Sequence, residues 1–323
     1  MVEFSQILDA RETIAGSVPE TPVFSSTQLG ERLGVSLWLK AELFQKTGSF
    51  KPRGALNRLR NTSRADLDRG LITVSAGNHA QGLAWAARMV GAACTVVMPA
   101  RASQTKAAAA RGYGAEVVLH GTIAEAFAMA AELQREKGYL LVHAFDDPLI
   151  IAGQGTIGLE IVEQVPEVDV IVCPIGGGGL ISGIALAAKS LIPHIRVYGV
   201  EPEGASALRQ SWDRGEVVHL EAVNTIADGL AAPMAGQITY PMTRKYLDDI
   251  ALVSDDEIAA GVRAVMAYAK LYAEPAGAAA TAALLAGRIP VKPGETVVSV
   301  VSGGNLDFDK LQSILSMGKA FEE

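Results

Sequence analysis

Ser49-Phe50-Lys51-Pro52-Arg53-Gly54 is the most informative segment of this chain, because it sets one lysine between an aromatic residue and a predicted turn. Lysine is almost never buried without a partner. Desolvation lowers the pKa of a lysine, and a neutral amine is a nucleophile that can form a Schiff base with a carbonyl compound. The segment alone also fits a solvated surface charge, so its weight depends on three further motifs.

Those motifs each follow a predicted strand, and they are Ser75-Ala76-Gly77-Asn78-His79, Gly176-Gly177-Gly178-Gly179-Leu180 and Ser302-Gly303-Gly304-Asn305. In open parallel sheets, ligands bind at the ends of strands. Four glycines before a helix let backbone N–H groups turn toward one anion, which predicts a phosphate site. Their spacing matches neither a dinucleotide fingerprint nor a P-loop. Purely structural alternatives are a helix cap at Ser75 or Asn78, a structural His79, and a glycine turn capped by Ser302.

Short β-like runs alternate with longer helical runs along the chain, which predicts an α/β protein with parallel sheets. Two helices open with capping boxes, Thr122 with Glu125 and Ser254 with Glu257. The segment from Trp212 to Tyr240 is predicted to include a loop near the site. Predicted strands cover 71–74, 94–98, 116–119, 168–173, 196–200 and 296–301; predicted helices cover 80–89, 103–111, 122–137, 149–164, 180–191, 254–270 and 276–285.

Composition narrows the class of protein. The 323 residues have 49% hydrophobic and 20% charged residues and a net charge of −7 without a basic block, which disfavours nucleic acid and anionic membrane surfaces as partners. The N-terminus has no signal-peptide pattern and no stretch is apolar enough to span a membrane, so a cytoplasmic protein is expected. Cys94 and Cys173 lie in strand-like runs and are predicted to be buried, reduced thiols.

Taken in order along the chain, the four motifs resemble the fold-type-II pyridoxal-phosphate enzymes of the serine/threonine dehydratase and serine racemase family. Further matching stretches are 44–48, 151–156, 227–229 and 274–275. The resemblance implies a two-lobed α/β fold of the tryptophan synthase β type, in which each lobe is a mostly parallel twisted sheet flanked by helices. It implies a large cofactor-binding domain at 1–60 and 141–323, a small substrate-capping domain at 61–140, and no C-terminal regulatory domain.

The resemblance also implies roles for single residues. Lys51 is the Schiff-base lysine and catalytic base for pyridoxal 5′-phosphate. The substrate is bound by Ser75, Ala76, Gly77, Asn78 and His79, and all of these except Ala76 contact its carboxylate. The cofactor is bound by Phe50 on the ring, Asn78 at the 3-hydroxyl, Gly176, Gly177, Gly178 and Gly179 at the phosphate, Ser302 at the pyridine nitrogen, and also Leu180, Gly229, Glu274 and Gly303.

Two departures within the family favour β-elimination of an L-β-hydroxy amino acid, giving a 2-oxo acid and ammonia. Ala76 occupies the position of a proton-transferring serine in racemases, and Phe145 the position of an asparagine. Alternatives are a serine or aspartate racemase, a sulfhydrylase-like β-replacement enzyme, or a regulatory protein that binds a phosphate ligand without Lys51 chemistry. The substrate is left open among threonine, serine, a hydroxyaspartate and a β-aryl serine, and a homodimer or homotetramer is expected.

A cation site is the last implied feature. Glu201 matches an acidic ligand of a divalent-cation site in the racemase-like branch, with Ala205 as its companion. The second acid of that site falls at Ala207, which has no ligand atom, whereas hard cations need several oxygen donors. A monovalent ion or no ion is therefore expected, with Glu203 or Asp213 as a possible replacement.

Overall fold

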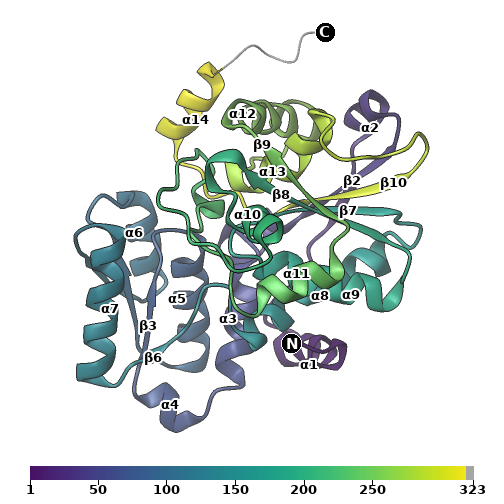
Figure 1. Cartoon of the computed structure of the whole chain (residues 1–323). Coiled ribbons are helices and arrows are strands. Elements are labelled where there is room, and N and C mark those ends of the chain that lie inside the picture. The colour runs from purple at the N-terminus through teal and green to yellow at the C-terminus, as the bar shows by residue number, and fades with distance from the viewer. Residues whose placement is uncertain (318–323) are drawn as a thin grey trace.

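The computed structural model describes residues 1–317, which form two β-sheets flanked by helices (Figure 1). The larger sheet has six strands in the order β1-β2-β10-β7-β8-β9. All neighbours in it run parallel except β1, which pairs antiparallel with β2. Its strands are β1 (Val23–Ser25), β2 (Ser36–Ala41), β7 (Val170–Pro174), β8 (Arg196–Pro202), β9 (Asp249–Val253) and β10 (Thr296–Val301).

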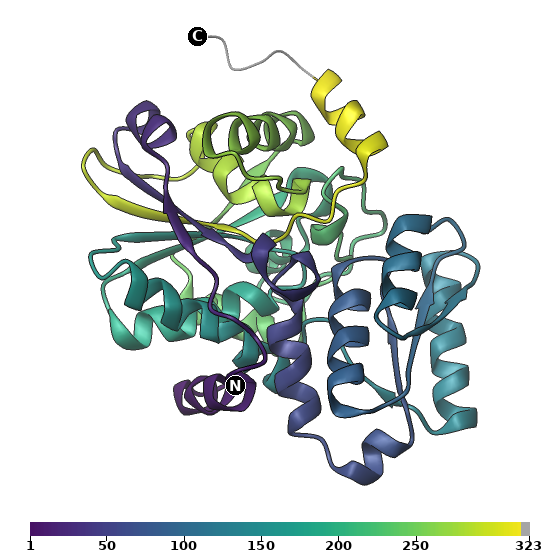
Figure 2. The ribbon, with the colours of Figure 1, turned by 180° about the vertical axis from the view of Figure 1, so that it is seen from behind.

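The smaller sheet has four strands in the order β5-β4-β3-β6, all of them parallel to their neighbours. They are β3 (Leu71–Val74), β4 (Cys94–Met98), β5 (Glu116–Leu119) and β6 (Leu140–Leu141). Figure 2 shows this lobe beside the larger one, and α3 (Lys51–Arg60) packs against helices of both. The predicted architecture of two lobes with mostly parallel sheets is confirmed, whereas the domain limits at 60/61 and 140/141 stay a prediction.

Helices cover both faces of the larger sheet. One layer is formed by α8 (Pro148–Gln164) and α9 (Gly179–Leu191), which pack against each other, and the opposite layer by α12 (Asp255–Ala264) and α13 (Pro275–Leu285) (Figure 1). The other helices of this lobe are α1 (Phe4–Ile14), α2 (Thr27–Leu33), α10 (Ala207–Arg214), α11 (Thr239–Tyr246) and α14 (Phe308–Ser316). Those around the smaller sheet are α4 (Arg64–Asp68), α5 (Asn78–Val90), α6 (Gln104–Gly112) and α7 (Ile123–Lys137).

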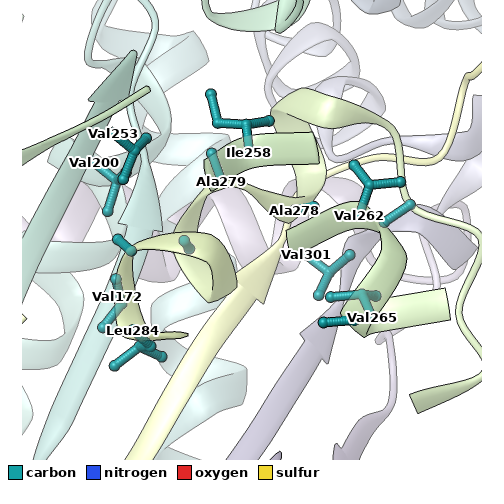
Figure 3. Close-up of a cluster of buried hydrophobic side chains, with 14 of the residues drawn as sticks. Val172, Val200, Val253, Ile258, Val262, Val265, Ala278, Ala279, Leu284 and Val301 are labelled. Atoms are coloured by element: carbon teal, nitrogen blue, oxygen red, sulfur yellow. The ribbon is translucent and has the colours of Figure 1, made fainter. Parts of the chain in front are cut away.

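Alternate residues of the central strands point to opposite faces of the larger sheet. Val172 and Val301 belong to the buried cluster beneath α12 and α13 (Figure 3). Ile171 and Val300 belong instead to the cluster beneath α8 and α9. Because both faces are covered, these strands are mostly apolar, as is usual in parallel sheets, and the buried Ser299 of β10 pairs its hydroxyl with that of Thr281 at 2.9 Å.

The predicted elements agree with the structure where the local pattern is strong. The strands at 71–74, 94–98, 116–119 and 296–301 are confirmed at the same residues, and both capping boxes are present. The helix predicted from 254 to 270 is wrong in its second half: α12 ends at Ala264, a π-helical turn covers Val265–Ala269, and Lys270 follows with a φ of 60°. A left-handed residue ends a right-handed helix. Other predicted limits shift by one or two residues.

Two smaller predictions concern cysteines and membrane spans. Cys94 in β4 and Cys173 in β7 are buried and unpaired, which confirms two core thiols. Burial raises the pKa of the Cys94 thiol to about 12. Within residues 1–317, no helix combines the length and the hydropathy that a bilayer crossing requires.

Candidate active site

Lys51 is the first residue of α3, so the prediction of a turn that follows Lys51 is wrong. The turn comes before it, in the short 3₁₀ helix Lys46–Gly48, where Thr47 has a φ of 65° and Gly48 a φ of 72°. Pro52 then occupies the first turn of α3, where a missing backbone N–H costs no helical hydrogen bond.

The Lys51 side chain has an apolar and electrically neutral environment. Its Nζ donates to the carbonyl oxygen of Ala144 at 2.9 Å and lies 5.0 Å from the centre of the Phe50 ring. No carboxylate in the described part of the chain forms an ion pair with it. Burial therefore lowers the pKa of Lys51 from 10.5 to about 8. An appreciable fraction of this amine is neutral near physiological pH.

The four glycines connect β7 to α9. Gly178 has a φ of 90°, and a Cβ at Gly177 would lie only 2.3 Å from the ring of Phe145. Thr239 holds the loop from outside by donating its hydroxyl to the Gly177 carbonyl at 2.7 Å. The first N–H groups of a helix have no acceptor within it, and here the glycines that carry them line a cavity. This geometry fits a phosphate group.

The Ser75–His79 motif connects β3 to α5. Ser75 accepts a hydrogen bond at its Oγ from the Gly77 backbone N–H at 3.3 Å. The amide nitrogen of Asn78 donates to Oε1 of Glu274 at 2.5 Å. His79 is buried, with Nε2 3.3 Å from the Val142 carbonyl, and burial lowers its pKa to about 3. A neutral, buried imidazole favours the structural alternative for His79.

Ser302 follows β10 and is buried. Its hydroxyl donates to the Ala276 carbonyl at 3.4 Å, at the long end of the hydrogen-bond range, so this hydroxyl can accept a better partner. Gly303 lies behind it, where a Cβ would fall 2.3 Å from Oε1 of Glu274. Burial is the largest influence on Glu274 and raises the pKa of its carboxyl group.

These segments surround one cavity of about 570 Å³. All of the predicted cofactor and substrate residues line it except Gly303, namely Phe50, Lys51, Ser75, Ala76, Gly77, Asn78, His79, Gly176, Gly177, Gly178, Gly179, Leu180, Gly229, Glu274 and Ser302. The predicted loop near the site is also present, since residues 228–233 line the cavity. The structure thus brings these residues together, while their individual roles stay predictions.

Several lining residues had no signal in the sequence. Arg101, Lys106 and Phe127 come from the smaller lobe, and His143 lies next to the Ala144 carbonyl that Lys51 contacts. His143 accepts at Nδ1 from the backbone N–H of Asp146 at 2.8 Å. Burial lowers the pKa of His143. None of these positions follows a glycine motif, so only the tertiary fold reveals them.

Glu201 and Ala205 lie away from this cavity, on β8 and the 3₁₀ helix Glu203–Ala205. The buried Glu201 carboxylate accepts from the backbone N–H groups of Leu208 at 2.9 Å and Arg209 at 2.8 Å, near the start of α10. Burial nevertheless raises the pKa of Glu201 to about 8. Across residues 1–317, no cluster of three or more His, Cys, Asp or Glu side chains is placed to hold a metal ion.

Comparison with known proteins identifies the class. Residues 14–303 match the family described as pyridoxal-phosphate dependent enzyme, so the chain belongs to that family. An L-threonine ammonia-lyase of Geobacter sulfurreducens is 43% identical over 98% of this chain and 79% of its own length. Threonine deaminase isoform 2 of Solanum lycopersicum has a TM-score of 0.92 at 38% identity, over 98% of this chain and 93% of the other. Maize serine racemase has a TM-score of 0.92 at 37% identity, over 98% and 97%.

The family resemblance seen in the motifs is therefore confirmed, with the dehydratase branch represented among the relatives by sequence and by structure. Pyridoxal phosphate fits the residues present. The four glycines line the cavity at the start of α9, where backbone N–H groups are available to an anion. At the same cavity, Lys51 presents a partly neutral amine that has no carboxylate partner among residues 1–317.

Proposed function

We propose that this protein is an ammonia-lyase that removes the β-hydroxyl group and then the amino group of an L-β-hydroxy amino acid of the threonine or serine type. The products are a 2-oxo acid and ammonia. The observation that carries the proposal is Lys51, a cavity-facing amine whose pKa burial lowers to about 8 and which no carboxylate of residues 1–317 neutralises. The names of the relatives, L-threonine ammonia-lyase and threonine deaminase, support threonine as the first substrate to test.

Bound pyridoxal phosphate supplies an electron sink that makes the Cα proton of an attached amino acid acidic. In this chain the N–H groups of Gly176–Gly179 would hold the phosphate, Phe50 would pack on the ring and Ser302 would face the ring nitrogen. Lys51, once free and neutral, would accept the Cα proton at Nζ. The Ser75–His79 segment would hold the substrate carboxylate through its backbone N–H groups and orient that proton toward Lys51.

A serine-hydroxyl partner for the ring nitrogen favours elimination. A neutral hydroxyl stabilises a protonated ring less than a carboxylate would, so negative charge at Cα is not held for long. Elimination of the β-hydroxyl group removes that negative charge from Cα. Ser302 is therefore consistent with a lyase in which the carbanionic character is short-lived.

The similarity to maize serine racemase makes racemisation the second candidate. Racemisation requires a second acid–base group of the protein on the face opposite Lys51, and Ala76, which lines the cavity, has no transferable proton. Phe145, whose ring packs over Gly177, likewise offers none. Both positions support elimination over racemisation.

The test is turnover of purified protein with L-threonine and L-serine, followed by 2-oxo acid, ammonia and chiral analysis of the remaining amino acid. We expect equimolar 2-oxo acid and ammonia with residual substrate of unchanged chirality. Racemisation at a rate comparable to ammonia release would contradict the assignment to elimination. If the purified protein shows no visible absorption band from bound cofactor, the alternative of a regulatory protein that binds a phosphate ligand is favoured.

We further propose a homodimer or homotetramer in the cytoplasm. Phe24 on the edge strand β1 and Phe44 form an edge-to-face pair, 6.0 Å between ring centres, and expose 41% and 53% of their surface. Aromatic residues are enriched in the cores of protein interfaces, so we take this pair as part of the contact surface between subunits. Light scattering during size-exclusion chromatography measures the oligomeric state, and a monomeric mass would contradict this proposal.

A further inference from the structure

Asn305 connects three segments that are far apart in sequence. Its side-chain nitrogen donates to the carbonyl oxygen of Thr47 at 2.8 Å and to Oδ1 of Asn78 at 2.8 Å. The amide nitrogen of Asn78 in turn donates to Oε1 of Glu274. Asn305 itself does not line the 570 Å³ cavity, whereas Asn78 does. Asn305 is therefore a neighbour of the site and not a contact of its ligand.

The backbone carbonyl of Thr47 fixes the direction of this series of hydrogen bonds. A carbonyl oxygen only accepts, so the nitrogen of Asn305 must face Thr47. The second hydrogen of the same nitrogen points to Asn78, which must therefore present its oxygen to Asn305. If the Asn78 amide were flipped, its oxygen would face the Glu274 carboxyl oxygen and its nitrogen would face the Asn305 nitrogen.

The consequence lies at the cavity. With its oxygen occupied by Asn305, Asn78 presents only N–H donors to Glu274 and to the cavity. A donor at this place suits an anionic oxygen such as a phenolate, whereas a carbonyl oxygen would repel it. The same Asn305 also holds the Thr47 carbonyl next to a strained φ of 65°, four residues before Lys51.

We propose that Asn305 is a positioning residue, which fixes the amide of Asn78 with its donor side toward the cofactor. The proposal rests on the proposed function, because it takes the predicted contact between Asn78 and the 3-hydroxyl of pyridoxal phosphate as its target. Asn305 acts through Asn78 and touches neither cofactor nor substrate.

The test is a double-mutant cycle read out as cofactor affinity. Asn305→Asp keeps the shape of the side chain, but an ionised carboxylate cannot donate to Thr47 or Asn78. Titration of the cofactor-free variants with pyridoxal phosphate measures Kd by absorption or fluorescence. We expect Asn305→Asp to weaken binding by about tenfold, the effect of losing one well-placed hydrogen bond to a charged group. Asn61→Asp, the same change on an exposed asparagine, is the control and should leave Kd unchanged.

The double-mutant cycle distinguishes an effect of Asn305 through Asn78 from a general disturbance of the structure. In an Asn78→Ala background the Asn305→Asp change should have no further effect on Kd, because the group it orients is absent. The same cycle with Asn305→Ala carries the test if the aspartate variant does not fold. An unchanged Kd in Asn305→Asp, or losses that simply add in the double variant, would overturn the proposal. Absence of any pyridoxal phosphate binding by the wild-type protein would instead overturn the proposed function.

Discussion

Lys51 and Arg53 lie two residues apart at the start of α3, yet they have opposite surroundings. The Arg53 guanidinium donates from Nε and Nη2 to Glu42 at 2.8 Å each, and from Nη1 to Glu160 at 2.5 Å. Although burial opposes it, the charges of Glu42 and Glu160 raise the pKa of Arg53 above its ordinary value. Lys51 has only a carbonyl partner, and burial lowers its pKa to about 8.

The difference shows how one helix turn carries two kinds of cation, the fully buried Arg53 and the half-buried Lys51. Lys40 completes the group around Arg53 by donating to Glu160 at 2.6 Å, so two cations balance two carboxylates there. A balanced group keeps its charge and stabilises the packing of α3, provided that all members are present. A poorly solvated amine without a carboxylate partner, here called unbalanced, tends to lose its proton. Arg53 therefore supports the fold, and Lys51 is available for chemistry.

Removing the unbalanced amine should have the largest effect on turnover. Lys51→Ala is expected to lower kcat by at least about a thousandfold, since proton transfer by a positioned group alone contributes 10²–10⁴. Steady-state assay of ammonia release measures this. Lys46→Ala, which removes an exposed lysine from the same segment, is the matched control and should retain activity. Comparable activity in the two variants would show that Lys51 has no chemical role.

Stability should respond to the two cations in opposite directions. Arg53→Met leaves Glu42 and Glu160 without their main partner and should lower the free energy of unfolding by about 3–5 kcal/mol. Lys51→Met replaces a poorly solvated amine by an apolar side chain and should raise the free energy of unfolding by about 1–2 kcal/mol. This is less than the full free-energy equivalent of the lowered Lys51 pKa, because the cavity admits water. Urea unfolding of the cofactor-free proteins at pH 7 compares them. Destabilisation by both changes would contradict the proposed difference between the ion-paired Arg53 and Lys51, which has no carboxylate partner.

The stabilisation in Lys51→Met should also depend on pH. The folded pKa of Lys51, about 8, lies below the unfolded value of 10.5, so the unfolded chain binds more protons between these values. The wild-type protein therefore gains stability as pH rises from about 8 to 10.5, and its difference from Lys51→Met should disappear across this window. A difference that is constant with pH would show that the Lys51 pKa is not lowered.

Glu201, on β8 and outside the cavity lining, provides a smaller test. Glu201→Ala leaves the N–H groups of Leu208 and Arg209 without an acceptor and should cost about 1–2 kcal/mol of stability. The folded pKa of about 8 exceeds the model-peptide value, so wild-type stability should fall as pH rises from about 4.5 to 8. In urea unfolding, Glu201→Gln should remove this dependence of stability on pH. An unchanged pH dependence would show that another group causes it.

The smallest effect is expected from cation removal. Because both Glu201 oxygens already accept from the backbone and Ala207 offers no ligand, chelation should leave turnover nearly intact and added magnesium should barely change the Tm. Activity assays and thermal melts with and without chelator measure this. A large loss of activity that magnesium restores, and that Glu201→Ala abolishes, would show that a cation site exists with other ligands.

The sequence predicted those features that depend on neighbouring residues. The strands at 94–98 and 116–119 and the Thr122 capping box follow from local alternation and spacing, and the motifs at strand ends meet at one cavity as parallel-sheet topology requires. The turn at Lys51 was misplaced because proline is tolerated both in a turn and in the first turn of a helix.

Features that depend on distant partners were not predictable. Arg53 meets Glu160 across 107 residues, and Asn305 meets Thr47 across 258. Nothing local indicates that Gly54 and Gly153 allow α3 and α8 to approach, although a Cβ on Gly153 would lie 2.6 Å from the Gly54 Cα. The partners of Glu201 likewise depend on where α10 begins. Such contacts are set by tertiary packing, which single-sequence patterns do not encode.

Whether Lys51 carries the cofactor can be read directly from the position of the covalent adduct along the chain. The protein with bound pyridoxal phosphate is reduced with borohydride, digested, and examined by peptide mass spectrometry. We expect a reduced pyridoxyl group on Lys51 alone, with Lys40, which is paired with Glu160, unmodified. A principal adduct on Lys40, Lys106 or any other lysine would contradict it.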